Sequence, residues 1–310
     1  MEATLTHSIA AATTLGPVRL TVADLARSHS FYEEVLGLHA TELDRDAVTL
    51  GSAPNGSSPL VELRADASAS PLDRRAPGLY HLAIRVPSRA DLGQALLRLA
   101  RSRWPLDGAS DHLVSEALYL SDPDGNGIEI YRDRPREQWR YDNGALQMST
   151  LPLDLHAIVA ETAGAGPALD LGTEPQIEDT VPAATTIGHV HLQVADLRES
   201  EAFYAGVLGF DVVVRGYPGA LFVSAGGYHH HLGLNTWHSA GAEPAALGAV
   251  GLRSYDVILP GQSELDQVLE RVGAAGLPLI HGPGEPACVL PEAAFGVRDP
   301  SGNLVVLRCS

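Results

Sequence analysis

The chain repeats one short pattern, and this internal repetition limits its possible folds more than any other feature. The sequence GPVRLTVADL at residues 16–25 returns as GHVHLQVADL at residues 188–197. Each copy alternates in the manner of a strand with one buried face. Each then runs into a predicted helix that ends alike, in FYEEVLG at residues 31–37 and FYAGVLG at residues 203–209. Because glycine commonly caps helix C-termini, these copies predict two modules that open with a strand and a helix.

A second kind of module begins at residues 78–87 (GLYHLAIRVP) and again at residues 251–260 (GLRSYDVILP). Predicted helices follow each strand, at residues 89–101 and 263–274. The chain therefore contains four strand–helix–strands modules, which we number 1 to 4 in chain order.

Modules 2 and 4 end in matching hairpins, with the turns DPDGN at residues 122–126 and DPSGN at residues 299–303. Proline presets one turn angle, and glycine allows a positive φ. After the first turn, Ile128 and Ile130 face one side of the predicted strand and Glu129 faces the other. An acid between two isoleucines is either solvated or held by a cation.

The repeats predict the domain boundaries. Residues 1–14 form an N-terminal extension, residues 15–133 a first domain of two modules, and residues 186–310 a second domain of two modules. Residues 134–185 between them carry Gly, Pro, Ala and Thr, which predicts a linker with one short helix near residues 153–161. The alternative is a partly ordered segment that wraps over the first domain.

Composition excludes several functions. The 38 acidic and 21 basic residues give a net charge of −17, which argues against nucleic acid and anionic membranes as partners. No apolar run reaches the ~18 residues of a membrane helix. The start of the chain lacks the pattern of a signal peptide. Cys288 and Cys309 do not make a disulfide scaffold. These features predict a cytoplasmic protein.

The βαβββ modules, with FY…LG after the helix and DPxGN before the last strand, resemble the vicinal oxygen chelate superfamily of glyoxalases, bleomycin resistance proteins and extradiol dioxygenases. The resemblance implies an α+β fold of two glyoxalase-like domains, in which mixed sheets form cups that hold a metal. YHHHLGLNTW at residues 228–237 and the hairpin at residues 116–129 most resemble the bacterial catechol-2,3-dioxygenases of that superfamily.

In that superfamily the metal ligands come from the first and last strands of modules. The first-strand position lies seven residues before the aspartate of ADL in modules 1 and 3, at Pro17 and His189. It lies six residues before the strand-ending proline in modules 2 and 4, at His81 and Ser254.

The last-strand position lies three residues past the hairpin asparagine, at Glu129 in module 2 and Val306 in module 4. Module 1 offers Glu62, which we interpret as solvated or salt-bridged because its counterparts Pro17, Ser254 and Val306 are not ligands.

The predicted ligands are therefore His81 and Glu129 of module 2 with His189 of module 3. They share one cup only if module 2 pairs with module 3, and module 1 with module 4, so we predict this pairing. Two histidines and one carboxylate with open positions suit non-haem Fe(II) oxygen chemistry, and Mn(II) is the alternative metal.

The resemblance also implies catalytic residues. In extradiol dioxygenases a tyrosine stands ten residues before the glutamate ligand, which gives Tyr119, and a histidine stands further upstream, which gives His112. A further histidine belongs to the last strand of the module that supplies the first ligand.

That further histidine lies in the run His229-His230-His231. The family motif favours His230, whereas strict strand alternation places His230 on the face of Leu232 and Leu234 and favours His231. A bulge beside the site would reconcile the two, and we rank His230 first and His231 second.

The implied reaction is ring cleavage of a catechol, a small aromatic diol, by O2. One rival is a glyoxalase-like metal-dependent isomerase or lyase, which gains if His231 is a fourth ligand and the metal is Zn or Ni. The other is a metal-free, drug-binding resistance protein. The sequence leaves a homo-oligomer open.

Four other side chains have predicted positions in or near the cup. His191 shares the face of His189 and is predicted to line the cup. Arg85 shares the face of His81 and either binds a substrate carboxylate or forms a salt bridge. Trp104 and Trp237 either line the cup or pack in a core.

Overall fold

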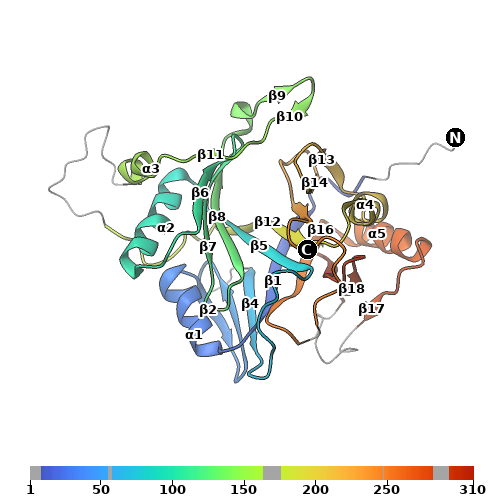
Figure 1. The fold of residues 1–310 in the computed structure, drawn as a ribbon, viewed down its shortest axis with the longest axis horizontal. Helices are drawn as coiled ribbons and strands as arrows, with labels where there is room; N and C mark the ends of the chain where they lie inside the picture. Colours follow the sequence, from blue (N-terminus) through green and yellow to red (C-terminus); the bar gives the residue numbers. More distant parts are fainter. Residues whose placement is uncertain (1–7, 55–57, 163–175, 247, 282–292) are drawn as a thin grey trace. The chain divides into compact units, whose positions relative to one another are not determined.

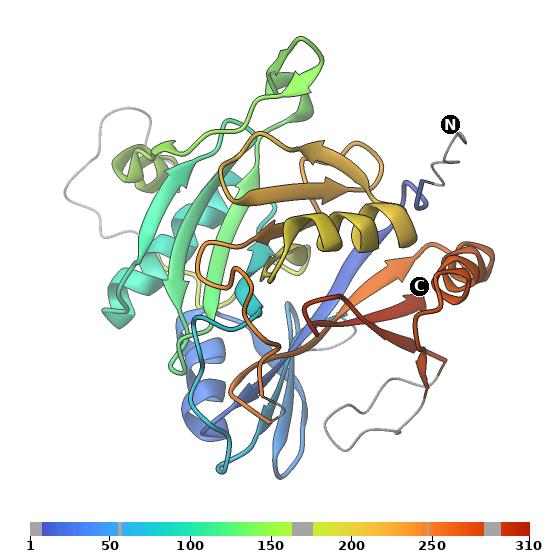
Figure 2. The same ribbon diagram turned by 45° about the vertical axis from the view of Figure 1, so that its right-hand side comes forward.

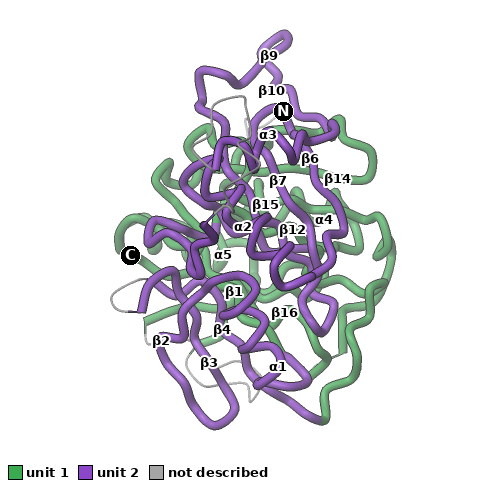
Figure 3. Tube along the Cα trace, turned by 90° about the vertical axis from the view of Figure 1, so that its left-hand side faces the viewer, with its two compact units in different colours: residues 1–21, 68–80, 188–310 green, residues 22–67, 81–187 purple. Residues whose placement is uncertain are grey.

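The computed structural model describes residues 8–54, 58–162, 176–246, 248–281 and 293–310. It divides into two compact units, which Figure 3 colours separately. Unit 1 contains residues 1–21, 68–80 and 188–310, and unit 2 contains residues 22–67 and 81–187. The fold is α+β, as predicted.

The larger sheet segment of unit 2 comes from module 2 and the start of the linker. Its strands lie in the order β11-β6-β7-β8-β5, with the bounds β5 (Gly78–Arg85), β6 (Gly108–Asp111), β7 (Ser115–Ser121), β8 (Gly127–Asp133) and β11 (Leu151–Pro152). β7 and β8 form the predicted hairpin, and β8 runs parallel to β5. A parallel pair needs a crossover, which the helix α2 (Arg89–Ser102) supplies.

α2 forms where the sequence predicted it. The Ser88 side chain accepts a hydrogen bond from the backbone N–H of Asp91 and caps the N-terminus. The apolar stripe of Leu92, Ala95 and Leu99 is buried, and α2 packs against β8. The linker helix α3 (Leu155–Thr162), predicted near residues 153–161, packs beside α2 (Figure 1).

The rest of unit 2 contains module 1 and short linker elements. The strands β2 (His39–Leu43), β3 (Ala47–Gly51) and β4 (Pro59–Ala65) are antiparallel neighbours. The helix α1 (Leu25–Ser30) continues into the π-helical turn η1 (Phe31–Val35) and ends at Gly37, whose φ of +82° confirms the predicted glycine cap. The linker adds η2 (Arg136–Gln138), β9 (Tyr141–Asp142) and β10 (Ala145–Leu146).

Unit 1 contains module 4 and the first strand of module 1. The strands lie in the order β17-β18-β19-β16-β1, with the bounds β1 (Thr14–Val22), β16 (Gly251–Leu259), β17 (Ile280–His281), β18 (Phe295–Arg298) and β19 (Leu304–Cys309). β1 runs antiparallel to β16, so the first strands of modules 1 and 4 pair as predicted. The helix α5 (Gln262–Ala274) packs on β16 and β19.

Module 3 forms the other sheet segment of unit 1. Its strands lie in the order β12-β15-β14-β13, with the bounds β12 (Thr186–Gln193), β13 (Asp211–Val214), β14 (Ala220–Ser224) and β15 (Leu232–Asn235). The helix α4 (Leu197–Glu201) with its π-helical continuation η3 (Ala202–Val207) covers β14 and β15 (Figure 2). Gly209 ends this segment at a φ of +92°.

Some predictions lie beyond what the structure describes. Residues 1–7 of the predicted N-terminal extension, residues 163–175 of the linker and Cys288 lie outside the described residues. The boundaries of two sequence-continuous domains stay a prediction. Among the described residues, no helix is both long and apolar enough to cross a membrane.

Candidate metal centre and catalytic residues

Two of the predicted ligands meet inside unit 2. His81 lies on β5 and Glu129 on β8, and both side chains are buried. The Nε2 atom of His81 lies 3.0 Å from the Oε2 atom of Glu129. Two ligand atoms that bind one ion at right angles and about 2.1 Å away are themselves about 3 Å apart. The pair therefore fits two positions in the coordination sphere of one metal ion.

An apolar cluster lines the sheet face beside Glu129. Ala83, Ala117 and Tyr131 are fully buried against one another, and Tyr119 packs against them. Tyr119 lies directly opposite Glu129 in the β7–β8 register, and its ring centroid is 5.6 Å from that of His81. The sheet thus presents Tyr119 on the face that carries both predicted ligands.

Tyr119 and His112, predicted from the family resemblance, are hydrogen-bonded. His112 follows β6, and its Nε2 atom lies 2.7 Å from the Tyr119 hydroxyl. The Nδ1 atom of His112 lies 2.7 Å from the carbonyl oxygen of Ser149. Because a carbonyl only accepts, Nδ1 carries the proton in the neutral ring and Nε2 accepts the hydroxyl proton of Tyr119.

A second side chain fixes the turn that carries His112. The Asp111 carboxylate accepts hydrogen bonds from the backbone N–H of Leu113 at 2.9 Å and from Nη2 of Arg134 at 2.7 Å. Leu113 has a φ of +70°, a conformation that few non-glycine residues adopt. Asp111 and Arg134 therefore hold a strained turn in the orientation that brings His112 to Tyr119.

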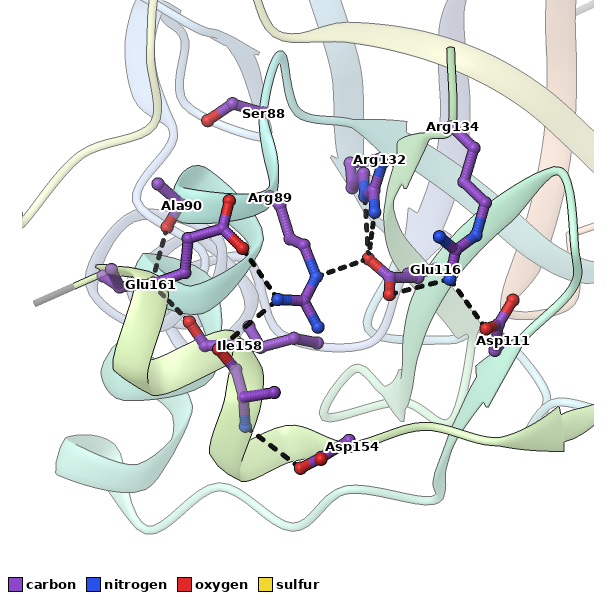
Figure 4. Close-up of polar contacts among 12 residues, drawn as sticks. Ser88, Arg89, Ala90, Asp111, Glu116, Arg132, Arg134, Asp154, Ile158 and Glu161 are labelled. Carbon is purple, nitrogen blue, oxygen red and sulfur yellow. Dashed lines mark hydrogen bonds and ion pairs between the residues drawn. The ribbon is translucent and has the colours of Figure 1, made fainter. Parts of the chain in front are cut away.

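Arg134 belongs to a wider ionic network around the buried carboxylate of Glu116 (Figure 4). Glu116 accepts hydrogen bonds from Arg89 at 2.9 Å, Arg132 at 2.8 Å and Arg134 at 3.0 Å. Arg89 also contacts Glu161 of α3 at 2.7 Å. The network ties β7, β8, α2 and the linker helix together, and it satisfies a buried charge that would otherwise be costly.

In unit 1, the third predicted ligand lies among histidine and aromatic rings. His189 on β12 is buried, and its ring centroid is 4.2 Å from that of His230, which is also buried. The Nδ1 atoms of His229 and His230 lie 2.8 Å apart, so one of them donates a proton to the other. His230, the first-ranked candidate, thus neighbours His189.

The strand alternation expected through the histidine run was wrong. β15 begins at Leu232, so His229, His230 and His231 lie in the connection that follows Ser224 rather than in the strand. The Nδ1 atom of His231 accepts a hydrogen bond from the backbone N–H of Ala225 at 3.1 Å. This contact ties His231 to the end of β14, whereas the His230 ring contacts Phe222 and His189.

Module 4 has Ser254 and Val306 at the corresponding positions, and a different charged group lies next to them. Ser254 and Asp256 are buried on β16, and the Asp256 carboxylate binds the guanidinium groups of Arg19 and Arg308. Val306 is fully buried in an apolar cluster. Within unit 1 these strands therefore carry an ion-pair network in place of the His–Glu pair.

Sequence reasoning missed the supporting residues. Nothing in the sequence marked Ser149 or Arg134, because both act through pairings that only the folded chain creates. The structure also resolves two open alternatives. Arg85 forms a salt bridge, with Asp133 at 3.3 Å. Trp104 packs in a core against Phe31, and its indole N–H donates a hydrogen bond to a backbone carbonyl.

The comparisons with known proteins define the family. Residues 14–130 and 186–307 match the model of the Glyoxalase/Bleomycin resistance protein/Dioxygenase superfamily. The match spans most of the chain, which therefore belongs to this superfamily, and the resemblance predicted from the repeats is confirmed.

One relative points to a particular class of enzyme within the superfamily. Catechol-2,3-dioxygenase of Bacillus subtilis (strain 168) is 43% identical over 293 residues, which cover 93% of this chain and 94% of the relative. This similarity supports the prediction of a dioxygenase enzyme.

Solved structures agree on the fold. A putative dioxygenase from Bacillus subtilis superposes with a TM-score of 0.61 at 13% identity, covering 98% of this chain and 86% of that one. Glyoxalase I from Zea mays gives a TM-score of 0.55 at 18% identity, covering 96% of this chain and 92% of that one. At these identities the likeness shows the fold alone.

Proposed function

We propose that the protein is an extradiol dioxygenase that cleaves the ring of a catechol with Fe(II) and O2. The observation that carries the proposal is the buried His81–Glu129 pair, which stands on the two strands where the family resemblance implies ligands. The 43% identical relative bears the name catechol-2,3-dioxygenase, which fits the same reaction.

We propose His81, Glu129 and His189 as the metal ligands. Each offers one ligand atom, and all three are buried. Two imidazoles and one carboxylate form the donor set of non-haem Fe(II) oxygenases, and they leave positions open. When bound there, Fe(II) supplies a Lewis acid for the diol oxygens and a route for electrons from the ring to O2.

Tyr119 and His112 would move the substrate proton. The Ser149 carbonyl keeps the His112 proton on Nδ1, so Nε2 accepts the Tyr119 hydroxyl proton. The Tyr119 oxygen can then take a proton from a catechol hydroxyl while its own proton passes to His112. This two-residue relay suits general base catalysis, since the hydrogen bond between Tyr119 and His112 is already in place for the second transfer.

His230 is the candidate acid on the unit 1 side. Its ring packs 4.2 Å from that of His189, and its Nδ1 shares a proton with His229. A histidine that is hydrogen-bonded at one nitrogen can donate or accept at the other. His231 stays the second candidate, although its Nδ1 already accepts from the Ala225 backbone.

The test is anaerobic loading with Fe(II), followed by metal analysis and by oxygen uptake with a panel of catechols. We expect one Fe(II) per chain, oxygen consumption and a yellow ring-opened product. His81→Ala and His189→Ala should each abolish metal binding and uptake. His156→Ala, an exposed histidine on α3, is the matched control and should retain both.

Three outcomes would reject the proposal. Retained iron in either ligand variant would remove that residue from the metal centre. A preference for Zn or Ni without oxygen uptake would favour the glyoxalase-like isomerase. Tight binding of an organic ligand by metal-free protein, again without uptake, would favour a resistance protein.

A further inference from the structure

Trp237 is a large apolar side chain that folding leaves exposed. It follows β15, and 38% of its surface is accessible. Yet its indole N–H donates to the Pro218 carbonyl at 2.9 Å, and its backbone N–H donates to the Asn235 side chain at 3.2 Å. The ring is thus held at two points while one part of it faces solvent.

The chain around Trp237 is shaped to receive the ring. Gly219 has a φ of +68°, and a Cβ atom there would lie 2.9 Å from the indole Cδ1. Asn235 is fully buried, so its contact with the Trp237 backbone is protected from water. An exposed tryptophan that is fixed in this way resembles the rigid aromatic anchors of binding sites.

A continuous row of rings joins Trp237 to the predicted metal ligand of unit 1. His191 lies 5.4 Å from Trp237 and 5.7 Å from Phe222, between ring centroids. Phe222 lies 5.0 Å from His230, which lies 4.2 Å from His189. All of these contacts lie within unit 1. We call the rings of Tyr80, His191, Tyr217, Phe222 and Trp237 the aromatic wall.

The spacing along β12 sets the size of what the wall can contact. His189 and His191 are two residues apart on β12, so they face the same side of the strand and their backbones are about 7 Å apart. That length is roughly one aromatic ring with the first atoms of a substituent. The substituent of a ring bound beside His189 would therefore reach the level of His191.

The chemistry of the wall selects flat, uncharged groups. None of the five wall residues is a lysine or an arginine, so the wall offers no permanent positive charge to a carboxylate. Tyr80 and Tyr217 flank Trp237 at 5.2 and 6.3 Å, and burial raises the pKa of the Tyr80 phenol. Aromatic rings stack best on such a surface.

We infer that Trp237 determines specificity, and that the enzyme prefers a catechol carrying a neutral, flat, apolar substituent over unsubstituted catechol and over catechols with an anionic side chain. This inference rests on the proposed function, because it places a catechol ring at His189. Asn235 acts as a positioning residue that fixes the turn under Trp237.

The experiment compares catechol, phenylcatechol and dihydroxyphenylacetate with Fe(II)-loaded wild type, Trp237→Ala and Trp237→Phe. A stacked aromatic pair corresponds to about a tenfold change in affinity. We expect Trp237→Ala to lower kcat/KM for phenylcatechol about tenfold and to change that for catechol by less than about twofold. Trp237→Phe should restore most of the loss. Tyr141→Ala, which removes another exposed aromatic side chain, is the matched control and should change neither value.

Binding provides a second measurement that does not depend on turnover. Anaerobic calorimetry should show the same tenfold weakening of phenylcatechol binding by Trp237→Ala, about the worth of one stacked ring. An equal loss for both substrates, or a wild-type preference for dihydroxyphenylacetate, would overturn the inference and leave the dioxygenase intact. Failure of loaded wild type to cleave any catechol would instead reject the proposed function.

Discussion

The hairpins of modules 2 and 4 share one turn structure but differ in the strands that follow the turn. In unit 2, the Asp122 carboxylate accepts hydrogen bonds from the backbone and side chain of Asn126 and from the Tyr32 hydroxyl at 3.2 Å. In unit 1, Asp299 accepts the same bonds from Asn303, and from the Tyr204 hydroxyl at 2.9 Å. Each turn is thus held to the helix of the preceding module by one buried tyrosine.

The strands that follow these turns carry unlike chemistry. β8 presents Glu129 beside Ala83 of β5, whereas β19 presents Val306 beside Asp256 of β16. In unit 2, the carboxylate of Glu129 lies next to His81. In unit 1, two arginine side chains neutralise the carboxylate of Asp256. The residues that hold the turns therefore occupy other positions than the proposed metal ligands, and we predict that each set can be changed separately.

The largest effect is expected from giving module 2 the residue of module 4. Glu129→Val should remove the only carboxylate ligand of the proposed set, so we expect metal content to fall to background and ring cleavage to fall by more than about a hundredfold. Folding should survive, because valine already fits the matching position at 306. Metal analysis and oxygen uptake measure the loss, and thermal unfolding checks the fold. Glu62→Gln is the control and should keep the metal. Iron retained by Glu129→Val would contradict the assignment.

The reverse exchange should damage stability rather than activity. Val306 is fully buried against Ala294 and Leu304. Val306→Glu places a carboxylate in that apolar cluster, and we expect the free energy of unfolding to drop by about 3 kcal/mol or more. Urea unfolding measures the loss. Val306→Thr has nearly the same shape and should cost less than half as much. An unchanged unfolding midpoint in Val306→Glu would show that the cluster admits a charge and that modules 2 and 4 do not differ in this respect.

The shared turns should respond alike in both halves. Asp122→Ala and Asp299→Ala each leave several buried donors without an acceptor, so we expect losses of about 2–3 kcal/mol in the free energy of unfolding for both. Urea unfolding of the two variants side by side is the measurement. A large loss in one variant and none in the other would show that the two turns are equivalent only in sequence.

The turns were readable from the sequence, and the proposed ligands could be placed on it, because each depends on short spacings. DPxGN encodes its own hydrogen bonds within five residues, and the glycine caps at Gly37 and Gly209 encode positive φ. His81, Glu129 and His189 could be located by counting along repeats. The β1–β16 pairing also followed from where the ligand positions fell.

The supporting contacts could not be read, because they join segments that are distant in sequence. Ser149 contacts His112 through a carbonyl oxygen, which every residue type possesses. Glu116 looks like any strand glutamate until three arginines surround it. The histidine run was assigned to a strand because alternation was extended past the true start of β15.

The smallest effect concerns pH, and it distinguishes the buried turn aspartates from exposed ones. Burial is the largest cause that raises the pKa of Asp299 above its ordinary value of 3.8, although its hydrogen bonds oppose the shift. A raised folded-state pKa favours the protonated form, so the pH-dependent part of the contribution of Asp299 to stability is fully present below pH 3.8 and is lost as pH rises through the folded pKa. Relative to Asp299→Asn, wild type should therefore lose stability as the pH rises above 3.8.

Asp196 caps α4 and provides the opposite case on the same unit. Backbone hydrogen bonds from Glu199 and Arg198 hold its pKa below 3.8. Its contribution is therefore present above pH 3.8 and is lost as pH falls, so wild type should gain stability over Asp196→Ala across the same rise in pH. Urea unfolding at several pH values measures both differences. Parallel slopes for the two aspartates would contradict the view that burial, rather than the hydrogen bonds that both share, dominates at the hairpin turn.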